Sequence, residues 1–347
     1  MSATTSQKID LKAFSLPELQ QYVVALGEPA FRAKQLFSWL YRPGIRTFEQ
    51  MSDVSKKFRD QLFQTARISQ LKLHKKEASA DGTVKYAFML PDEQIIESVL
   101  IPEDDRNTLC VSSQVGCAMG CKFCLTGTMG LKRNLTPAEI VNQVYFAMEE
   151  LTSSGSGKVN NLVFMGMGEP LANFNNLITA LAILTDGLGL NYSERKITVS
   201  TCGLVPKIIE LGEKTNVNLA ISLHAADDIT RNSIMPVNQT YPLKDLIQAC
   251  REFPLQKRKR IMFEYILLKG VNDSITDAKK LIKLLHGIPC KINLLPYNRC
   301  STLPYEKSLQ KSIDSFQKML KNADHTVIIR SSRGADISAA CGQLARK

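Results

Sequence analysis

Apolar residues in the last two thirds of the chain form short runs that alternate with amphipathic segments. The runs have the length of buried strands and lie at residues 108–112, 161–165, 196–200, 217–222, 260–268 and 291–295. The segments between them repeat apolar residues at helical spacing and include residues 136–151, 175–185, 243–253, 275–285 and 307–321. This alternation predicts an α/β protein with a parallel sheet covered by helices, a partial (β/α)6 TIM-like barrel.

The first hundred residues follow a different pattern. Ser15 and Glu18 form a capping box before an apolar-periodic segment, and further helices are expected at residues 29–41 and 52–64. Three β-rich stretches follow, separated by the turn signals Asp81-Gly82 and Pro91-Asp92. We therefore predict a helical accessory domain at residues 1–66, a β-rich connector at 67–102, and a core at 103–347.

Composition narrows the class of protein. The 347 residues carry 44% hydrophobic residues and nine cysteines, an odd number that favours a reducing compartment over a disulfide framework. No apolar run has the length of a membrane span, and the start lacks a signal core, so we expect a cytoplasmic protein without a membrane partner. The net charge of +11 suggests a polyanionic partner, although many basic proteins have none.

Three cysteines in one short segment carry the most specific chemistry. Cys117, Cys121 and Cys124 have the spacing CxxxCxxC, which offers three thiolates and no fourth. A structural zinc site normally has four ligands and pairs its cysteines as CxxC. The spacing therefore indicates an iron–sulfur cluster that keeps one iron open for a substrate. The segment directly follows the first strand of the predicted barrel, where chemistry is expected.

Polar residues follow other predicted strands. Residues 166–170 read Gly-Met-Gly-Glu-Pro, in which glycines allow close backbone approach and Glu169 can accept from an ammonium group. Ser200 ends the third strand, residues 222–224 (Ser-Leu-His) end the fourth, and Asn298 follows the sixth. These side chains can line one pocket, although His224 taken alone could be a structural histidine.

The cysteine spacing resembles the signature of the radical S-adenosylmethionine (SAM) enzymes. Over nearly the whole chain, the sequence resembles the dual-specificity adenosine C2-methyltransferases of 23S rRNA and tRNA within that superfamily. The resemblance is carried by residues 101–103, 108–114, 117–124, 133–135, 166–171, 222–224, 296–298 and 339–344. It implies a radical SAM barrel, a [4Fe-4S] cluster, and two SAM molecules per turnover. It also implies that the domain at residues 1–66 binds RNA, and that residues 103–347 are the radical SAM catalytic core, which ends in a loop with the catalytic cysteine.

The resemblance also implies a role for each matching residue. Cys117, Cys121 and Cys124 hold the cluster. The residues expected to contact SAM are Gly168, Glu169, Ser200, Ser222, Leu223, His224 and Asn298. Cys341 carries the methyl group, Cys110 forms a transient disulfide with it, and Glu97 is the proton acceptor. The implied partners are 23S rRNA, tRNA, an electron donor such as a flavodoxin and a thiol reductant, with the chain acting as a monomer.

Two alternatives stay open at this point. One is the related group that methylates adenosine at C8 and confers ribosomal antibiotic resistance. Leu125 and the pair Ser331-Ser332 depart from the expected pattern and bear on substrate preference. The other alternative is a non-catalytic RNA-binding protein with a structural metal centre, which the positive charge would suit. Several basic residues could contact RNA phosphates, or they could be ordinary solvated surface. They are Arg32, Lys34, Arg42, Arg46, Lys132, Arg133 and the run 257–260.

Overall fold

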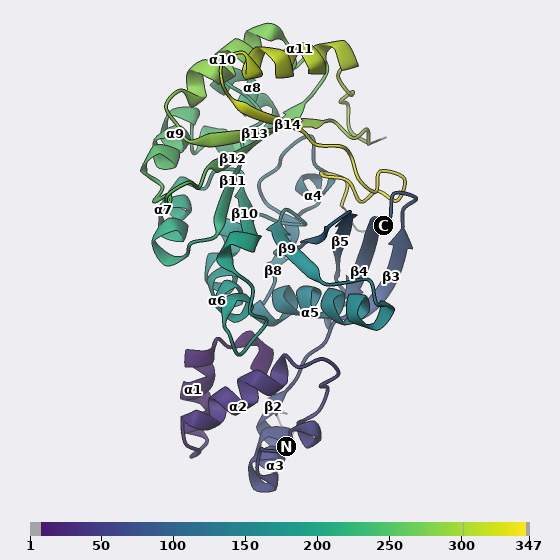
Figure 1. The fold of residues 1–347 in the computed structure, drawn as a ribbon, viewed down its shortest axis with the longest axis vertical. Helices are drawn as coiled ribbons and strands as arrows, with labels where there is room; N and C mark the ends of the chain where they lie inside the picture. Colours follow the sequence, from purple (N-terminus) through teal and green to yellow (C-terminus); the bar gives the residue numbers. More distant parts are fainter. Residues whose placement is uncertain (1–7, 301, 345–347) are drawn as a thin grey trace, which may run out of the picture. The chain divides into compact units, whose positions relative to one another are not determined.

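The computed structural model describes residues 8–300 and 302–344, which form two compact units (Figure 1). One unit, the first, comprises the described part of residues 1–72 together with residues 135–159 and 175–193. The second comprises residues 73–134, 160–174 and the described part of 194–347. No helix in the described part of the chain is long and apolar enough to cross a membrane.

A ten-stranded sheet forms the centre of the second unit. Its strand order is β14-β13-β12-β11-β10-β9-β6-β5-β4-β3. The strands from β9 to β14 pair in parallel, and their bounds are Val159–Phe164 (β9), Ile197–Thr201 (β10), Asn218–Ser222 (β11), Ile261–Leu267 (β12), Cys290–Pro296 (β13) and Thr326–Ile329 (β14). These parallel strands confirm the predicted fold class. β14 is one strand more than the sequence pattern predicted.

The remaining strands of this sheet form an antiparallel extension. They are Lys72–Ala78 (β3), Val84–Met89 (β4), Ile95–Glu103 (β5) and Arg106–Cys110 (β6). Strand β5 pairs antiparallel with both β4 and β6, and the turns predicted at Asp81-Gly82 and Pro91-Asp92 join β3 to β4 and β4 to β5. The β-rich connector is thus continuous with the barrel sheet. The predicted domain boundaries stay a prediction.

Helices of the second unit lie on one side of the parallel strands (Figure 1). They are Val205–Lys214 (α7), Asp228–Ile234 (α8), Leu243–Glu252 (α9), Ile275–Leu285 (α10) and Gln310–Lys321 (α11). Their apolar faces bury residues such as Leu246, Leu281 and Phe316, all without solvent exposure. The sequence pattern predicted α9, α10 and α11, whereas α7 and α8 were not anticipated.

The first unit is mainly helical. Its elements are Ile9–Asp10 (β1), Leu16–Ala25 (α1), Phe31–Leu40 (α2), Lys56–Thr65 (α3), Ala66–Arg67 (β2), Pro137–Ser154 (α5) and, except for its first residue, Phe174–Thr185 (α6). The predicted capping box is confirmed, because the Ser15 backbone nitrogen donates to Glu18 Oε2 at 2.7 Å. A second capping box joins Thr136 and Glu139 at the start of α5.

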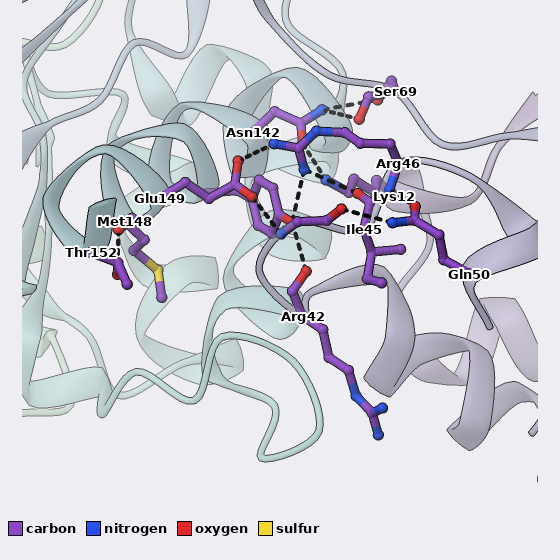
Figure 2. A network of polar contacts seen from close by, with 12 residues as sticks. Lys12, Arg42, Ile45, Arg46, Gln50, Ser69, Asn142, Met148, Glu149 and Thr152 are labelled. Carbon is purple, nitrogen blue, oxygen red and sulfur yellow. Dashed lines mark hydrogen bonds and ion pairs between the residues drawn. The ribbon is translucent and has the colours of Figure 1, made fainter. Parts of the chain in front are cut away.

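A polar network inside the first unit joins its N-terminal segment to α5 (Figure 2). Lys12 Nζ donates to Asn142 Oδ1 at 3.0 Å and lies 3.7 Å from the centroid of the Tyr145 ring. Asn142 turns its amide nitrogen to Ser69, whose hydroxyl it reaches at 2.9 Å. Arg46 pairs with Glu149 at 2.6 Å. Burial lowers the pKa of Lys12 to about 7, and the charges of Asp10 and Glu149 offset this only in part.

Candidate functional site

Ten of the thirteen predicted site residues line one cavity of the second unit. The empty space of about 1010 Å³ at this site includes open solvent. The ten residues are Cys117, Cys121, Cys124, Gly168, Glu169, Ser200, Ser222, His224, Asn298 and Cys341. Most of them follow the carboxyl ends of strands, as the barrel interpretation requires.

The cysteine segment is shaped by a small hairpin that the sequence pattern did not predict. Cys117 ends Gln114–Cys117 (β7), which pairs antiparallel with Gly130–Asn134 (β8), and Cys124 directly precedes the short helix Leu125–Thr128 (α4). Gly116 lies at a bulge with φ of 76°, and a Cβ atom there would come within 1.9 Å of the Gly130 carbonyl oxygen. Only glycine fits this position.

The three cysteines suit an iron–sulfur cluster. All three thiols are free, and an apolar wall that includes Phe123, Met235 and Ile266 packs against this segment. Burial raises the pKa of the Cys117 thiol to about 12, so only a bound metal would stabilise the thiolate. No three His, Cys, Asp or Glu side chains among residues 8–300 and 302–344 converge on a position for a single ion. A cluster binds its cysteines through separate iron atoms, so the cysteines need only surround a space.

The segment after β9 brings a buried carboxylate to the cavity. Glu169 Oε1 accepts from the Leu171 backbone nitrogen at 3.0 Å, and Oε2 accepts from that of Cys202 at 2.8 Å. The side chains of Thr201 and Cys202 also bond to this carboxylate. Burial raises the pKa of Glu169 despite these bonds. Gly168 has φ of 97°, and a Cβ atom there would come within 2.5 Å of Gln114, so this glycine is required by packing as well as by any ligand.

His224 is a neutral donor at the cavity wall. Burial lowers its pKa to about 3, and the nearby Arg231 adds to the effect. Its Nδ1 accepts from the Ile266 backbone nitrogen at 3.1 Å, which leaves the proton of the neutral ring on Nε2. The ring also stands edge-on to Phe123, with centroids 4.8 Å apart. His224 can therefore donate one hydrogen bond to a ligand.

Hydroxyl and amide groups complete the polar lining. Ser200 and Ser222 lie on the neighbouring strands β10 and β11, with their hydroxyl oxygens 3.4 Å apart. Asn298 accepts a hydrogen bond from the Ser332 hydroxyl. These groups could recognise the polar parts of a SAM molecule, and together with Gly168 and Glu169 they fit that cofactor.

Cys341 and Cys110 lie near one another on different elements. Cys341 is exposed to the cavity, while Cys110 is buried at the end of β6. Burial raises the pKa of Cys110, and the Cys341 charge raises it further. The pKa of Cys341 is also raised, because the surrounding protein atoms desolvate its sulfur although the residue keeps solvent contact through the cavity. No disulfide joins them.

Three predicted site residues do not line the cavity: Cys110, Glu97 and Leu223. Glu97 is buried on β5, with Oε1 3.5 Å from Lys85 Nζ. Leu223 is fully buried, and its backbone carbonyl accepts from Arg231 at 3.0 Å. Whether these residues take the roles that the resemblance implies stays a prediction.

Two charged residues of the site were missed. Arg231 on α8 is fully buried and donates to the backbone carbonyls of Leu223 and Cys202 at 3.0 and 2.7 Å. It thereby orients the ends of two strands. Glu264 on β12 lines the cavity, and burial raises its pKa to about 7. A single carboxylate in the apolar run 261–267 was a signal for Glu264, whereas nothing in the sequence marked Arg231.

Several basic residues considered for RNA contacts also have partners within the protein. Arg46 pairs with Glu149, Arg133 pairs with Asp92 at 2.7 Å, and Arg42 stacks on the Trp39 ring at 4.0 Å. Such pairing does not prevent RNA binding, and these contacts stay a prediction.

Two family models match the chain. Residues 9–68 match the ribosomal RNA large subunit methyltransferase N-terminal domain, and residues 111–282 match the radical SAM superfamily.

Curated relatives match along the whole length. The chain is 54% identical over 348 aligned residues to the dual-specificity RNA methyltransferase RlmN of Desulfotalea psychrophila, covering 99% of this chain and 96% of the relative. It is 55% identical to the protein of the same name from Geotalea uraniireducens, covering 97% of each. Among solved structures, a radical SAM methyltransferase from Sphaerobacter thermophilus matches with a TM-score of 0.91 and 42% identity, covering 96% of this chain and 98% of that one.

Proposed function

Because the chain belongs to the RlmN family of dual-specificity RNA methyltransferases, within the radical SAM superfamily, we propose that it methylates C2 of adenosine in 23S rRNA and tRNA. The rRNA target is an adenosine of the peptidyl transferase centre, and the tRNA target is the adenosine 3′ to the anticodon. The observation that carries the proposal is that Cys341 lines the same cavity as the three cysteines of the CxxxCxxC segment.

The chemistry explains why such an arrangement is needed. Adenine C2 is an electrophilic amidine carbon, so it cannot attack the methyl group of SAM as a nucleophile. Cys117, Cys121 and Cys124 would hold the cluster, and Gly168, Glu169, Ser200, Ser222, His224 and Asn298 would hold SAM. When bound, the cluster and SAM supply a carbon-centred radical that can abstract a hydrogen atom.

Three residues of the chain, Cys341, Glu97 and Cys110, carry out the remaining steps. Cys341 Sγ loses its proton and accepts a methyl group by displacement, so that the group is held as a thioether. Attachment of that carbon to adenine C2, after loss of one hydrogen atom, would leave an unpaired electron, which the bound cluster would accept while Glu97 takes the C2 proton. Cys110 loses its proton and attacks Cys341 Sγ. The carbon–sulfur bond then breaks, the released carbon takes up a proton to become the 2-methyl group, and a disulfide remains. Reduction of that disulfide requires two electrons from an external thiol, and an electron donor such as a flavodoxin serves the cluster.

The burial of these groups supports the assignment. Cys110 is buried, whereas Cys341 is exposed and lines the cavity, so Cys110 does not compete with Cys341 for the first methyl group. His224 stays neutral and cannot repel a sulfonium cation. We place the enzyme in the cytoplasm with its RNA substrates, acting as a monomer. A target base must leave its stack to reach the cavity.

Neither alternative is favoured by the comparisons. The relatives carry the name of the dual-specificity enzymes, rather than that of the C8-methylating group. A non-catalytic RNA-binding protein would need neither a cavity of this size nor Cys341 beside the cysteine segment.

Nucleoside mass spectrometry tests the proposal. The reconstituted protein, SAM and a reductant are incubated anaerobically with unmethylated 23S rRNA or tRNA, with Cys341→Ala and Cys110→Ala in parallel. We expect 2-methyladenosine from the wild type alone. In Cys110→Ala we expect RNA to remain covalently attached, because nothing releases it from Cys341. Formation of 8-methyladenosine, or no modified adenosine with either RNA, would refute the proposed function.

A further inference from the structure

The segment that carries Cys341 is held at both of its ends. We call residues Gly334–Leu344 the Cys341 segment. After the cysteine, the Gly342 carbonyl accepts from the Leu125 backbone nitrogen at 2.8 Å, and the Leu344 carbonyl accepts from the Thr126 hydroxyl at 2.6 Å. These two bonds tie it to α4, directly after Cys124. The attachment before the cysteine is of a different kind.

Before the cysteine, the segment is bound to the hairpin of β3 and β4. The Gly334 backbone nitrogen donates to Asp81 Oδ2 at 2.9 Å. In the opposite direction, Asp336 accepts from the Ser79 hydroxyl at 2.6 Å and from the Ala80 backbone nitrogen at 3.3 Å. Asp81 is itself oriented by the Thr83 backbone nitrogen, which donates to its Oδ1 at 2.9 Å. Each side of the contact therefore supplies one carboxylate, and each carboxylate accepts hydrogen bonds from the opposite side.

Close packing leaves little freedom at this junction. Gly334 has φ of 63°, and a Cβ atom there would come within 2.8 Å of Ala339 Cβ and 2.9 Å of Thr83 Cγ2. A larger residue would push the segment off the hairpin. Hydrogen bonds to Asp336 lower its pKa, led by the one from Ser79. The carboxylate is thus ionised, and such bonds are stronger than those between neutral groups.

Lys85 extends this attachment into the sheet. Its Nζ donates to the Ile337 carbonyl at 2.6 Å and lies 3.2 Å from Glu77 and 3.5 Å from Glu97. Lys85 is only 6% exposed, so its cation has to be satisfied by these three acceptors. One buried side chain thereby links the Cys341 segment to Glu97.

We propose that Asp81, Lys85 and Asp336 are positioning residues that hold the Cys341 segment on the β3–β4 hairpin and keep the Cys341 sulfur in the cavity. The inference rests on the proposed function, in which Cys341 carries the methyl group. Its sulfur then has to meet a methyl donor, a radical, an adenine and Cys110 in turn. Lys85 also holds Glu97 in register with the Cys341 segment, because Glu97 and the Ile337 carbonyl of that segment both contact the same amine. Positioning of this kind contributes to rate through orientation.

The test uses Asp336→Ala as the main variant, because Asp336 is exposed and its loss should not unfold the protein. Lys85→Met is the second variant. The matched controls are Asp104→Ala, an exposed carboxylate in the turn between β5 and β6, and Lys269→Met, a lysine that pairs with Glu306 away from this hairpin.

Two quantities are measured on the reconstituted protein. Hydrogen exchange of a peptide covering residues 334–344 reports release of the segment. The ratio of methyladenosine to 5′-deoxyadenosine reports whether radical formation is still coupled to methyl transfer. We expect exchange to accelerate about tenfold in Asp336→Ala, roughly the worth of one charge-assisted hydrogen bond, and the product ratio to fall by about the same factor. Total 5′-deoxyadenosine should be retained in both variants, and both controls should match the wild type.

Unchanged exchange in Asp336→Ala and Lys85→Met would overturn the inference, and so would faster exchange with an unchanged product ratio. If the wild type forms no methyladenosine, the proposed function fails. The exchange comparison then still decides whether the residues hold the segment.

Discussion

Replacing the buried lysine of the first unit should change how stability depends on pH. Lys12 is fully buried, and its amine contacts Asn142 and the Tyr145 ring (Figure 2). Burial is the main cause that lowers its pKa from 10.5 to about 7, with Asp10 and Glu149 opposing and Arg46 adding to the effect. In Lys12→Met the amine is absent, and the pH dependence that it causes is lost.

The sign follows from proton counting. Between the folded pKa near 7 and the unfolded value near 10.5, the unfolded chain binds one proton more than the folded chain. The free energy of unfolding therefore rises with pH by about 1.4 kcal/mol per unit in this window. Because the folded lysine is half-titrated near pH 7, the rise between pH 6 and pH 9 is about 2.7 kcal/mol. Below pH 6 both states are protonated and the contribution is constant.

The chain offers a local probe for this measurement. Trp39 is its single tryptophan, and it lies on α2 in the same unit. Urea unfolding followed by Trp39 fluorescence at pH 6, 7, 8 and 9 gives the free energy for wild type and variant. Lys34→Met is the matched control, because Lys34 is exposed on α2.

We expect the wild type to gain about 2.7 kcal/mol relative to Lys12→Met between pH 6 and pH 9. Lys34→Met should follow the wild type. A constant difference between wild type and Lys12→Met across this range would refute the assignment of a neutral buried amine at high pH.

Three further predictions concern the second unit. Glu264→Gln should gain stability relative to the wild type as pH rises from about 4.5 to about 7, because burial raises the pKa of Glu264 to about 7 and the wild type loses stability as its unfolded chain ionises first. Urea unfolding followed by circular dichroism checks this, and a difference in unfolding free energy between the two proteins that is the same at pH 5 and pH 8 would contradict it. Arg231→Met should lower the free energy of unfolding by about 3 kcal/mol, since two buried carbonyls lose their donor at about 1–3 kcal/mol each; an unchanged urea midpoint would count against it. Gly116→Ala should lower iron and sulfide content after reconstitution, because its Cβ would meet the Gly130 carbonyl oxygen at 1.9 Å. Gly130 also has positive φ, but a Cβ atom there would have no atom within 4 Å, so Gly130→Ala should retain the cluster. Equal losses in both variants would show that backbone strain alone, and not the clash, matters.

Local pattern was sufficient for the repeated part of the fold. The apolar runs placed β9 to β13 within a few residues, and the capping box at Ser15 placed the start of α1. Such signals are local, because burial on both faces requires a continuous apolar run and a helix start requires its own cap. The pattern failed for β14 and for the β7–β8 hairpin. Neither strand of the hairpin has the continuous apolar run that marked the others, because residues 114–117 read Gln-Val-Gly-Cys and residues 130–134 read Gly-Leu-Lys-Arg-Asn.

The convergence of the site was also predictable in part. Parallel strands place their carboxyl ends at one edge, so residues as far apart as Cys117 and Asn298 could be assigned to one pocket. Arg231 could not be assigned, because a buried arginine on an amphipathic helix has the same pattern as an exposed one. Its role depends on carbonyls of other elements.

The sequence alone determined the barrel and, through resemblance, the family, and it predicted the cysteine ligands. Tertiary structure alone decided the attachment of the Cys341 segment to the β3–β4 hairpin, where Asp336 and Ser79 meet across 257 positions of the chain. Hydrogen bonds between segments so distant leave no periodicity or spacing in either one. They exist only when the sheet brings the two turns together, and for that reason the position of Cys341 had to be read from the fold.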